Sequence, residues 1–210
     1  GTGFRAPSYF ELFGAIPAFN FVGNPDLKAE RSTGWDAGVA WNPFENFLVD
    51  LTWFDNRIRN LIDFSPANIG RATTRGIELS AQGKICDDYL GWRGCYTWQQ
   101  ASDDVTGSRL VRRARHRASF DLMGEPVEGL VLGAGITYSE GIEDNDFSIF
   151  PAIRRELDSV VLLRAYCSYQ MNDNVSLYGR VENLLDRSYE EIADYPGRGL
   201  GIFGGMRVRW

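Results

Sequence analysis

Residues 161–170 are Val161-Leu162-Leu163-Arg164-Ala165-Tyr166-Cys167-Ser168-Tyr169-Gln170. The odd-numbered positions are apolar or aromatic, whereas Arg164, Ser168 and Gln170 occupy even-numbered positions. Successive side chains of a β-strand point to opposite faces, so a period of two separates these sets, while a helix would mix them. The stretch therefore predicts a β-strand with one apolar face and one polar face.

The same alternation recurs along the whole chain. It predicts nine strands, at residues 33–42, 46–57, 70–83, 89–101, 112–123, 129–140, 157–170, 174–184 and 199–210. Residues 1–5 predict the end of one earlier strand. Most of these strands are long, because strands in globular proteins usually have about 5–6 residues.

The connections between the predicted strands alternate in length. Short ones lie near 42–46, 87–88, 124–128 and 171–174, and long polar ones near 58–69, 102–111, 141–156 and 185–198. In an antiparallel sheet, all short turns then fall at one end and all long loops at the other. This asymmetry is typical of bacterial outer-membrane barrels, which place apolar residues toward lipid and polar residues toward the lumen. Alternation alone also fits a soluble β-sandwich.

Composition limits the classes of function. The 210 residues carry a net charge of −6, which argues against non-specific binding to nucleic acid. The only histidine, His116, lies among the apolar positions of its predicted strand. Zinc enzymes and catalytic triads need histidine beside other ligands or partners. We therefore predict no catalytic residue, no metal site and no cofactor.

The ends and the cysteines add further expectations. The chain starts in the middle of a strand pattern, without a signal peptide or an apolar run long enough for a membrane helix, so we expect a piece of a longer protein. Cys86 and Cys95 flank a predicted hairpin, and a disulfide between them stays open. Cys167 is expected on an apolar face.

Four motifs together resemble the C-terminal part of TonB-dependent outer-membrane receptors. They are Gly3-Phe4-Arg5-Ala6-Pro7-Ser8 with Glu11-Leu12-Phe13, then Asn24-Pro25-Asp26-Leu27-Lys28-Ala29-Glu30-Arg31-Ser32, Gly76-Ile77-Glu78-Leu79, and Val181-Glu182-Asn183-Leu184-Leu185-Asp186 with Ser188-Tyr189. They stand in the family's order. The resemblance implies an all-β fold, an antiparallel transmembrane β-barrel segment with about nine strands of a 22-stranded barrel. Residues 1–210 would be its C-terminal part, without the plug domain and the N-terminal strands, and would form an open sheet with unpaired edges.

The resemblance also implies a function and a location. The complete protein would be a receptor in the bacterial outer membrane for TonB-energised uptake of a scarce nutrient. Cobalamin receptors look most similar in element order and spacing, and ferric-siderophore receptors share most motifs. Partners would be a small-molecule ligand, TonB through the missing plug, outer-membrane lipid and lipopolysaccharide, and the barrel assembly machinery through the last strand, which ends at Trp210. The alternatives are an outer-membrane barrel enzyme (protease or phospholipase) and a soluble β-sandwich binding module.

Two groups of residues are candidates for functional sites. Aromatic residues of the first long loop could stack on a ligand ring or pack on one another, namely Tyr9, Phe10, Phe13, Phe19 and Phe21. Charged residues at polar positions of the strands are expected to face the lumen, namely Arg113, Arg115, Arg117, Arg164, Arg180 and Glu182.

Two other sets of polar residues are expected to be structural. The run Glu143-Asp144-Asn145-Asp146 lacks the spacing of a calcium loop, and we expect it to be an exposed acidic loop tip. Asn183 and Asp186 are expected to hold a turn through hydrogen bonds from side chain to backbone.

Overall fold

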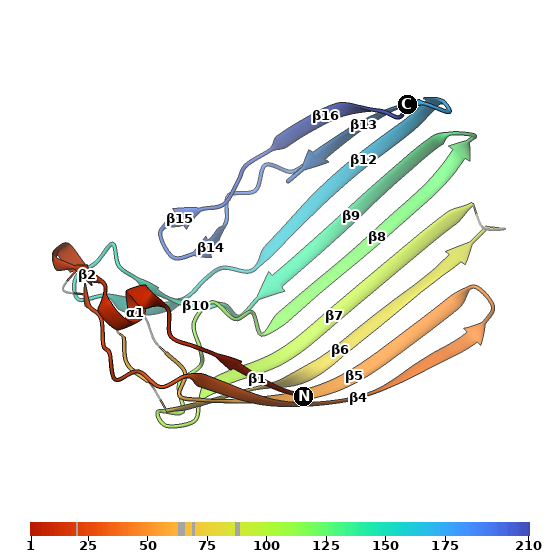
Figure 1. Cartoon of the computed structure of the whole chain (residues 1–210). Coiled ribbons are helices and arrows are strands. Elements are labelled where there is room, and N and C mark those ends of the chain that lie inside the picture. Colours follow the sequence, from red (N-terminus) through yellow and green to blue (C-terminus); the bar gives the residue numbers. More distant parts are fainter. Residues whose placement is uncertain (20, 63–65, 69, 87–88) are drawn as a thin grey trace. The chain divides into compact units, whose positions relative to one another are not determined.

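The computed structural model describes all residues from 1 to 210 except 20, 63–65, 69 and 87–88. Its main element is a ten-stranded antiparallel sheet in which each strand pairs with the next one of the sheet along the chain (Figure 1). The strands of this sheet are β1 (Thr2–Arg5), β4 (Glu30–Phe44), β5 (Phe47–Arg59), β6 (Arg71–Ile85), β7 (Leu90–Asp103), β8 (His116–Val127), β9 (Leu130–Glu140), β12 (Val160–Asn172), β13 (Val175–Glu182) and β16 (Gly201–Val208). The nine predicted strands and the earlier strand are thus confirmed.

The remaining elements lie in the long loops. They are the helix α1 (Tyr9–Phe13), the 3₁₀ turn η1 (Pro17–Phe19), and three two-stranded pairs, β2 (Ala15–Ile16) with β3 (Phe21–Val22), β10 (Glu143–Asp146) with β11 (Ile153–Glu156), and β14 (Glu190–Ile192) with β15 (Tyr195–Pro196). None of the helices in the described part of the chain is long and apolar enough to span a membrane.

The chain divides into two compact units. Unit 1 comprises residues 1–37, 53–77 and 99–110, and unit 2 comprises 38–52, 78–98 and 111–210. Unit 1 therefore contains the loop-end halves of β4 to β7. Unit 2 contains their turn-end halves and all of the sheet from β8 onward.

Register determines which side chains share a face in unit 2. Asp121 on β8 lies opposite Gly135 on β9, which lies opposite Arg164 on β12. One residue along, Phe120, Ile136 and Leu163 are aligned in the same way and point to the other side of the sheet. We call the side of Asp121 the polar face and the side of Phe120 the apolar face.

Large apolar side chains of the apolar face are exposed in this chain. Examples are Phe120, Leu132, Ile136, Ile202 and Met206. The described hydrophobic cluster of buried residues lies instead near the loop end, where Ala114, Ile142, Leu157 and Ala193 pack together. A soluble sandwich covers its apolar face with a second sheet. The additional sheets among the described residues are two-stranded loop pairs, so this face suits contact with lipid.

The strand predicted at 112–123 begins later than expected. Arg112 has a φ of 59°, in the left-handed region, and β8 starts only at His116. The backbone N–H groups of Arg112 and Arg115 donate to the carbonyls of Glu143 and Glu140, at 2.8 and 2.9 Å. Arg113 and Arg115 therefore precede β8, and the prediction that they share one strand face with Arg117 is wrong.

Cys86 and Cys95 are free. The backbone N–H of Tyr89 donates to the carbonyl of Cys86 at 3.1 Å and closes the hairpin beside Cys86. Cys95 lies five residues into β7 beyond Leu90, a distance of roughly 17 Å along an extended strand. Disulfides need Cα atoms within about 7 Å, so the open possibility of a Cys86–Cys95 bond is contradicted. Cys167 lies on the apolar face, opposite Leu132, as expected.

Candidate functional site: loops and polar face

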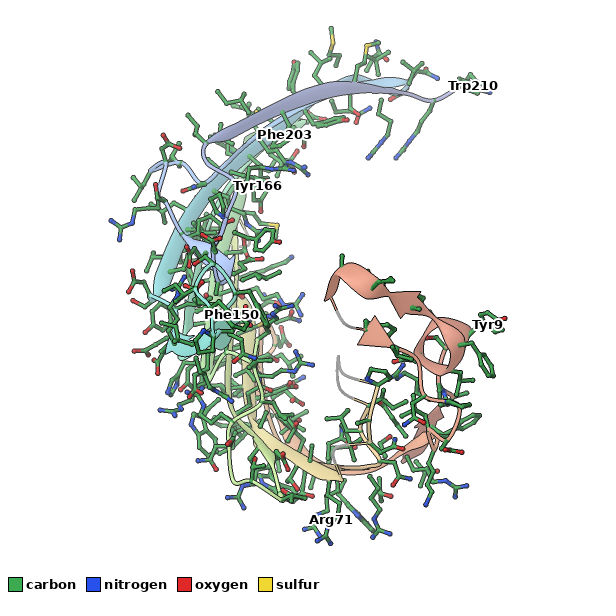
Figure 2. The ribbon with its side chains drawn as sticks, turned by 90° about the vertical axis from the view of Figure 1, so that its left-hand side faces the viewer. Tyr9, Arg71, Phe150, Tyr166, Phe203 and Trp210 are labelled. Carbon is green, nitrogen blue, oxygen red and sulfur yellow. The ribbon has the colours of Figure 1, made fainter. Side chains whose placement is uncertain are left out.

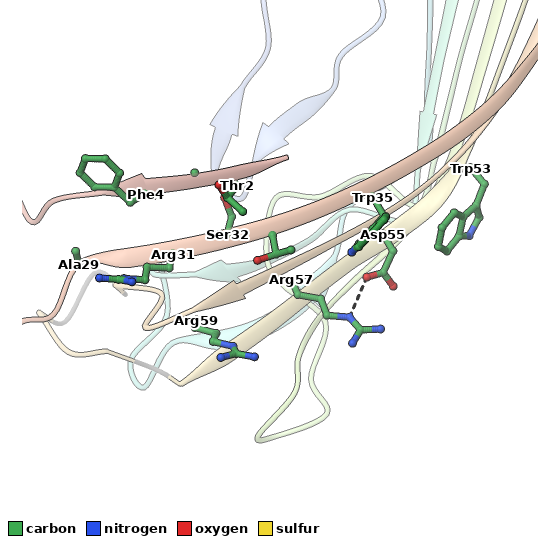
Figure 3. Close-up of a pocket in the computed structure, with 12 residues that line it drawn as sticks. Thr2, Phe4, Ala29, Arg31, Ser32, Trp35, Trp53, Asp55, Arg57 and Arg59 are labelled. Carbon is green, nitrogen blue, oxygen red and sulfur yellow. Dashed lines mark hydrogen bonds and ion pairs between the residues drawn. The ribbon is translucent and has the colours of Figure 1, made fainter.

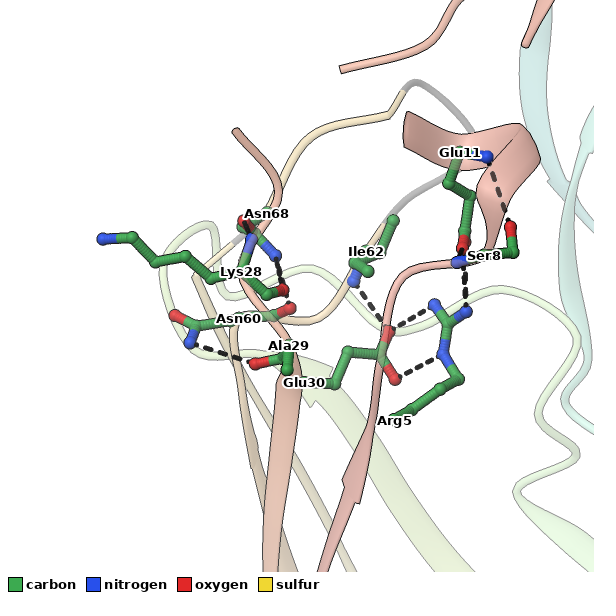
Figure 4. A network of polar contacts seen from close by, with 9 residues as sticks. All are labelled: Arg5, Ser8, Glu11, Lys28, Ala29, Glu30, Asn60, Ile62 and Asn68. Atoms are coloured by element: carbon green, nitrogen blue, oxygen red, sulfur yellow. Dashed lines mark hydrogen bonds and ion pairs between the residues drawn. The ribbon is translucent and has the colours of Figure 1, made fainter. Parts of the chain in front are cut away.

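Two of the sequence motifs meet through Arg5, at the end of β1 (Figure 4). Its guanidinium donates two hydrogen bonds of 2.8 Å to the carboxylate of Glu30, at the start of β4. A third nitrogen contacts both carboxylate oxygens of Glu11 at 3.1 Å, in helix α1. Glu30 also accepts the backbone N–H of Ile62 at 2.8 Å. We call Arg5, Glu11 and Glu30 the arginine clamp. The clamp connects α1 to β1 and β4 and, through Ile62, to the loop after β5.

Helix α1 is short but well capped. Ser8 is its N-cap, and its hydroxyl accepts the backbone N–H of Glu11 at 3.2 Å. Glu11 accepts the backbone N–H of Ser8 at 2.6 Å in return, so both halves of a capping box are present. The hydrogen bond from Ser8, assisted by Arg5, holds the pKa of Glu11 below its ordinary value despite partial burial. A helix this short needs such tertiary anchors, since isolated helices below about 12 residues are marginal.

A second set of bonds joins the loop before β4 to the loop after β5. Asn68 accepts the backbone N–H of Lys28 at 2.9 Å and donates to the carbonyls of Lys28 and Asn60 at 3.0 and 2.7 Å. Asn24 donates to the carbonyl of Pro66 at 3.1 Å. Residues 24–30 are thus held by their own Asn24 and Glu30 at the two ends, and by Asn68 of the loop after β5 at Lys28.

The predicted aromatic residues separate into two pairs. Phe10 stacks on Phe21 with ring centroids 4.8 Å apart, and Phe21 is only 8% exposed. Tyr9 and Phe13 contact each other at 5.1 Å and are exposed, Tyr9 by 80% (Figure 2). The side chain of Phe19 lies outside the described part of the structure. Mutual packing therefore accounts for Phe21, whereas Tyr9, Phe13 and Phe10, which is 48% exposed, stay accessible to a ligand.

The acidic run at 143–146 differs from the expectation of an exposed tip. Asp144 is 1% exposed. Its carboxylate accepts hydrogen bonds of 3.0 Å from Nε–H of Arg112 and from the backbone N–H of Ala193. Burial raises the pKa of Asp144, but these hydrogen bonds outweigh burial and hold the pKa below its ordinary value. No group of metal ligands is found among the described residues. The sequence missed this site because its partners lie 32 and 49 residues away.

Arg155 connects the acidic run 143–146 to a further loop segment. It contacts Asp146 at 2.9 Å and Glu190, on β14, at 2.6 Å. Ser148 and Arg155 lower the pKa of Asp146, and Glu190 and Asp146 raise the pKa of Arg155. The network of Asp144, Asp146 and Arg155 therefore joins three loop segments of unit 2 that the sequence separates.

The predicted role of Asn183 and Asp186 is confirmed. Both have positive φ, 49° and 47°. Asn183 donates to the carbonyls of Arg187 and Arg198 at 2.9 and 3.1 Å and accepts the backbone N–H of Arg187 at 2.9 Å. Asp186 accepts the backbone N–H of Leu200 at 2.8 Å. These bonds fix the loop that joins β13 to β16.

Of the predicted lumen-facing residues, those within strands share the polar face. Arg164 donates to Asp121 across Gly135 of the intervening strand. A Cβ at Gly135 would collide with Asp121 and Arg164, so the absence of a side chain makes this pair possible. Asp121 is a partner that the sequence pattern did not single out.

Arg180 is held by two neighbours on the same face. Its guanidinium lies 4.6 Å from the ring centre of Phe203 and pairs with Glu182 at 3.2 Å. Arg117 lines a hollow with Thr97, Ser139 and Glu191. The polar face thus presents paired charges and aromatic side chains, as an aqueous or plugged lumen accepts.

The single histidine has a structural partner. Nδ1 of His116 lies 2.8 Å from the hydroxyl of Tyr96, and both residues are on the apolar face. His116 therefore shares its face with Ala118, Phe120 and Leu122.

Comparison with known proteins identifies the family. A family model described as "TonB dependent receptor-like, beta-barrel" matches residues 1–184. The chain also resembles solved structures of the ferric-catecholate import receptor Fiu from K12 E. coli (TM-score 0.73, 19% identity) and of the copper transporter OprC (TM-score 0.78, 16% identity). A third is the ferripyoverdine receptor of the outer membrane of Pseudomonas aeruginosa (TM-score 0.74, 15% identity).

These matches cover almost the whole chain but only part of each receptor. They extend over 99%, 100% and 99% of this chain and over 32%, 36% and 30% of the three receptors. The chain spans about a third of their length. Both alternatives, the barrel enzyme and the soluble sandwich, are contradicted by the family match. The chain belongs to the β-barrel of the TonB-dependent receptors, a family of non-enzymatic receptors of the bacterial outer membrane.

Proposed function

We propose that the complete receptor imports a scarce nutrient across the outer membrane with energy supplied through TonB. The family match over residues 1–184 is the observation that carries this proposal. Within the receptor, this chain supplies a section of barrel wall and several external loops. TonB contacts the receptor through the plug domain, which lies outside this chain. The last strand, which ends near the exposed Trp210, is the signal for the assembly machinery.

The cargo we propose is cobalamin or a ferric siderophore. Tyr9 and Phe13 support a cargo with a flat or ring-containing surface, because exposed aromatic side chains held on a well-anchored element stack on such groups. The arginine clamp keeps α1 in place, which lowers the entropy that is lost when a ligand orders the loop. Phe21, which is buried against Phe10, supports the loop.

The polar face is proposed to line the lumen. Arg117, Arg164, Arg180 and Glu182 would then meet the plug or the water around it. Arg113 and Arg115, which precede β8, would stand at the rim of the lumen and not on its wall. Charged pairs suit this surface because they keep it hydrated while the plug moves.

The test is nutrient uptake by the complete receptor in a bacterium that lacks its own copy. We expect accumulation of either radiolabelled cobalamin or a radiolabelled ferric siderophore, and loss of accumulation when the gene for TonB is deleted. Uptake that persists without TonB would contradict energised transport. Failure to accumulate any of a panel of cobalamins and ferric siderophores, by a receptor that is folded in the membrane, would contradict the proposed cargo.

A further inference from the structure

The loop that joins β13 to β16 lies over the polar face of unit 2, away from the two strands that it connects. We call residues 187–198 the strap; they include the paired strands β14 and β15, at the loop end of the sheet (Figure 1). Tyr189 and Glu191 of the strap line the hollow around Arg117, on β8. Strands β12 and β9 separate β13 from β8 in the sheet, so the strap crosses both of them.

Contacts with two other loops hold the tip of the strap. The backbone N–H of Ala193 donates to the buried carboxylate of Asp144 at 3.0 Å, and Glu190 accepts a hydrogen bond of 2.6 Å from Arg155. Ala193 also packs in a small cluster with Ala114, Ile142 and Leu157. Two of these four side chains are single methyl groups, so the cluster buries little apolar surface and the polar contacts dominate the attachment of the tip.

The base of the strap is held independently of its tip. Asn183 donates to the carbonyls of Arg187 and Arg198, the first and last residues of the strap, at 2.9 and 3.1 Å. Within the strap, the backbone N–H of Gly197 donates to the carbonyl of Tyr189 at 2.7 Å. The ring of Tyr189 lies against Gly197, where a Cβ would collide with it. The strap is therefore a structured hairpin with a fixed base, and loss of the tip contacts frees its tip without unfolding it.

The hollow beneath the strap has the size and lining of a small-molecule site. Its volume is about 460 Å³, within the range of ligand pockets. The register of β7, β8 and β9 aligns its polar side chains in two rows, Thr97 with Arg117 and Ser139, and Cys95 with Ser119 and Thr137. On β12 these rows end in the apolar residues Val160 and Leu162. The hollow thus offers hydroxyl groups on one side and an apolar surface on the other.

The charges around the hollow select a class of ligand. Of the lining residues that the structure describes, Arg117 is the cation and Glu191, on the strap, is the acid. Their formal charges balance, so a polyanion would meet Glu191 without enough cations to compensate for its lost hydration. Hydroxyl groups both donate and accept hydrogen bonds, which suits neutral polar groups such as amides and hydroxyls.

We propose that the hollow is a holding site for one side of the cargo within the lumen, and that the strap is its lid. The hydroxyl rows bind amide or hydroxyl groups of the cargo, Val160 and Leu162 contact an apolar part, and Tyr189 covers it. Arg155 is a positioning residue, because it holds the lid through Glu190. The inference rests on the proposed function and favours cobalamin or a neutral ferric hydroxamate over an anionic ferric catecholate.

The experiment measures binding of three probes to the complete receptor in detergent. The probes are cyanocobalamin, an iron(III) tris-hydroxamate without net charge, and an anionic iron(III) tris-catecholate. Thr97→Val with Thr137→Val removes two hydroxyl groups from the hollow and keeps the shape of both side chains. We call it the hollow variant. Resistance of the folded barrel to heat in detergent verifies that each variant folds.

The matched control is Thr2→Val with Thr33→Val. These two threonines are partners in the pairing of β1 with β4. Both line a different hollow, in unit 1, together with Trp35 and Trp53 (Figure 3). The control therefore makes the same two chemical changes outside the proposed holding site.

We expect the original receptor to prefer one of the two neutral probes to the catecholate. The hollow variant should bind that probe roughly tenfold more weakly, since each lost hydrogen bond contributes a factor of about three. The control should bind like the original receptor. Equal affinities of the hollow variant and the control, or a preference for the catecholate, would overturn the holding site alone. Binding of none of the probes by the original receptor would contradict the proposed cargo itself, and the holding site with it.

Arg155→Gln tests the lid separately. It should speed release of the bound probe by roughly threefold, the scale of a partly exposed ion pair. Hydrogen exchange at Ala193 should increase, while exchange at Arg187 and Leu200, in the base of the strap, should stay unchanged. An unchanged release rate would refute the role of the strap as a lid.

Discussion

Arg5 and Glu30 are 25 residues apart in the chain and share two parallel hydrogen bonds of 2.8 Å. Each belongs to a different family-like motif, one at the end of β1 and one at the start of β4. Arg5 and Glu30 are directly opposite each other in the antiparallel pairing of β1 with β4, so both side chains lie on the same face. The two motifs are therefore joined by one ion pair, and Arg5 also holds α1 through Glu11.

Replacing Arg5 by lysine should loosen α1 without unfolding the sheet. Lysine keeps the charge but cannot form the paired hydrogen bonds to Glu30 while it also contacts Glu11. Because Arg5 is half exposed, we expect the local opening free energy of residues 8–16 to fall by about 1 kcal/mol. Hydrogen exchange of the complete receptor measures this change. Arg209→Lys, at the turn end, is the control, and equal exchange in both variants would refute the clamp.

Exposed and packed aromatic residues of the first loop should behave differently. We expect Tyr9→Ala and Phe13→Ala each to weaken binding of the imported ligand by roughly fivefold, because one aromatic stacking contact contributes about 1 kcal/mol. Phe21→Ala should instead destabilise the loop, since Phe21 is buried against Phe10. Ligand affinity and protease resistance of the loop separate the two effects. Normal affinity in both exposed-residue variants would exclude the pair from the binding site.

A methyl group at Gly135 should disturb the ion pair that crosses this position. Its Cβ would collide with Asp121 and Arg164, which pair across it. We expect Gly135→Ala to push the Asp121–Arg164 pair apart and to lower the stability of the barrel by up to about 1 kcal/mol, because the pair is partly exposed and its side chains can move. Gly94→Ala is the matched control, because a Cβ at Gly94 would meet the Phe120 ring at 3.5 Å, an ordinary contact. The denaturant midpoint of the folded receptor provides the comparison. Equal midpoints for the two variants would show that Gly135 is not needed for the pair.

The loop network of Asp144 and Asp146 should be stable to acid. Both carboxyl groups have a pKa below the ordinary value of 3.8, so their contribution to stability is fully present above pH 3.8. It is lost as the pH falls through the lowered values in the folded loops. Protease resistance of residues 141–156 should therefore remain constant from pH 7 to about pH 4 and decrease below it.

Asp144→Asn supplies the control for this pH dependence. The amide removes the charge that faces Arg112, so the loop should already be more accessible at pH 7. Its accessibility should also change less between pH 4 and pH 2 than that of the original receptor. A loss of protection centred above pH 5 in the original receptor would contradict the depressed pKa values.

Much of the fold follows from the sequence, because the side chains of a β-strand alternate between two faces with a period of two residues. The alternation at 161–170 predicted a strand and its two faces, since each residue in β12 must point opposite to the one before it. The turn chemistry of Asn183 and Asp186 was also predictable, because side chains of this type bind nearby backbone groups. The start of β8 was predicted wrongly, because Arg112 has a left-handed backbone and bonds to Glu143 of a distant loop, which the periodicity does not reveal.

The sequence by itself therefore determined the all-β class, the strand order, the two faces and, through four short motifs, the family. These depend on local periodicity and on the identity of residues within a few positions of one another. Only the tertiary structure decided which distant residues meet. It paired Arg5 with Glu30, buried Asp144 beside Arg112, packed Phe10 on Phe21, and placed arginines of β5 and β6 around one hollow. Such contacts depend on the register of neighbouring strands and on the paths of long loops, and neither follows from periodicity.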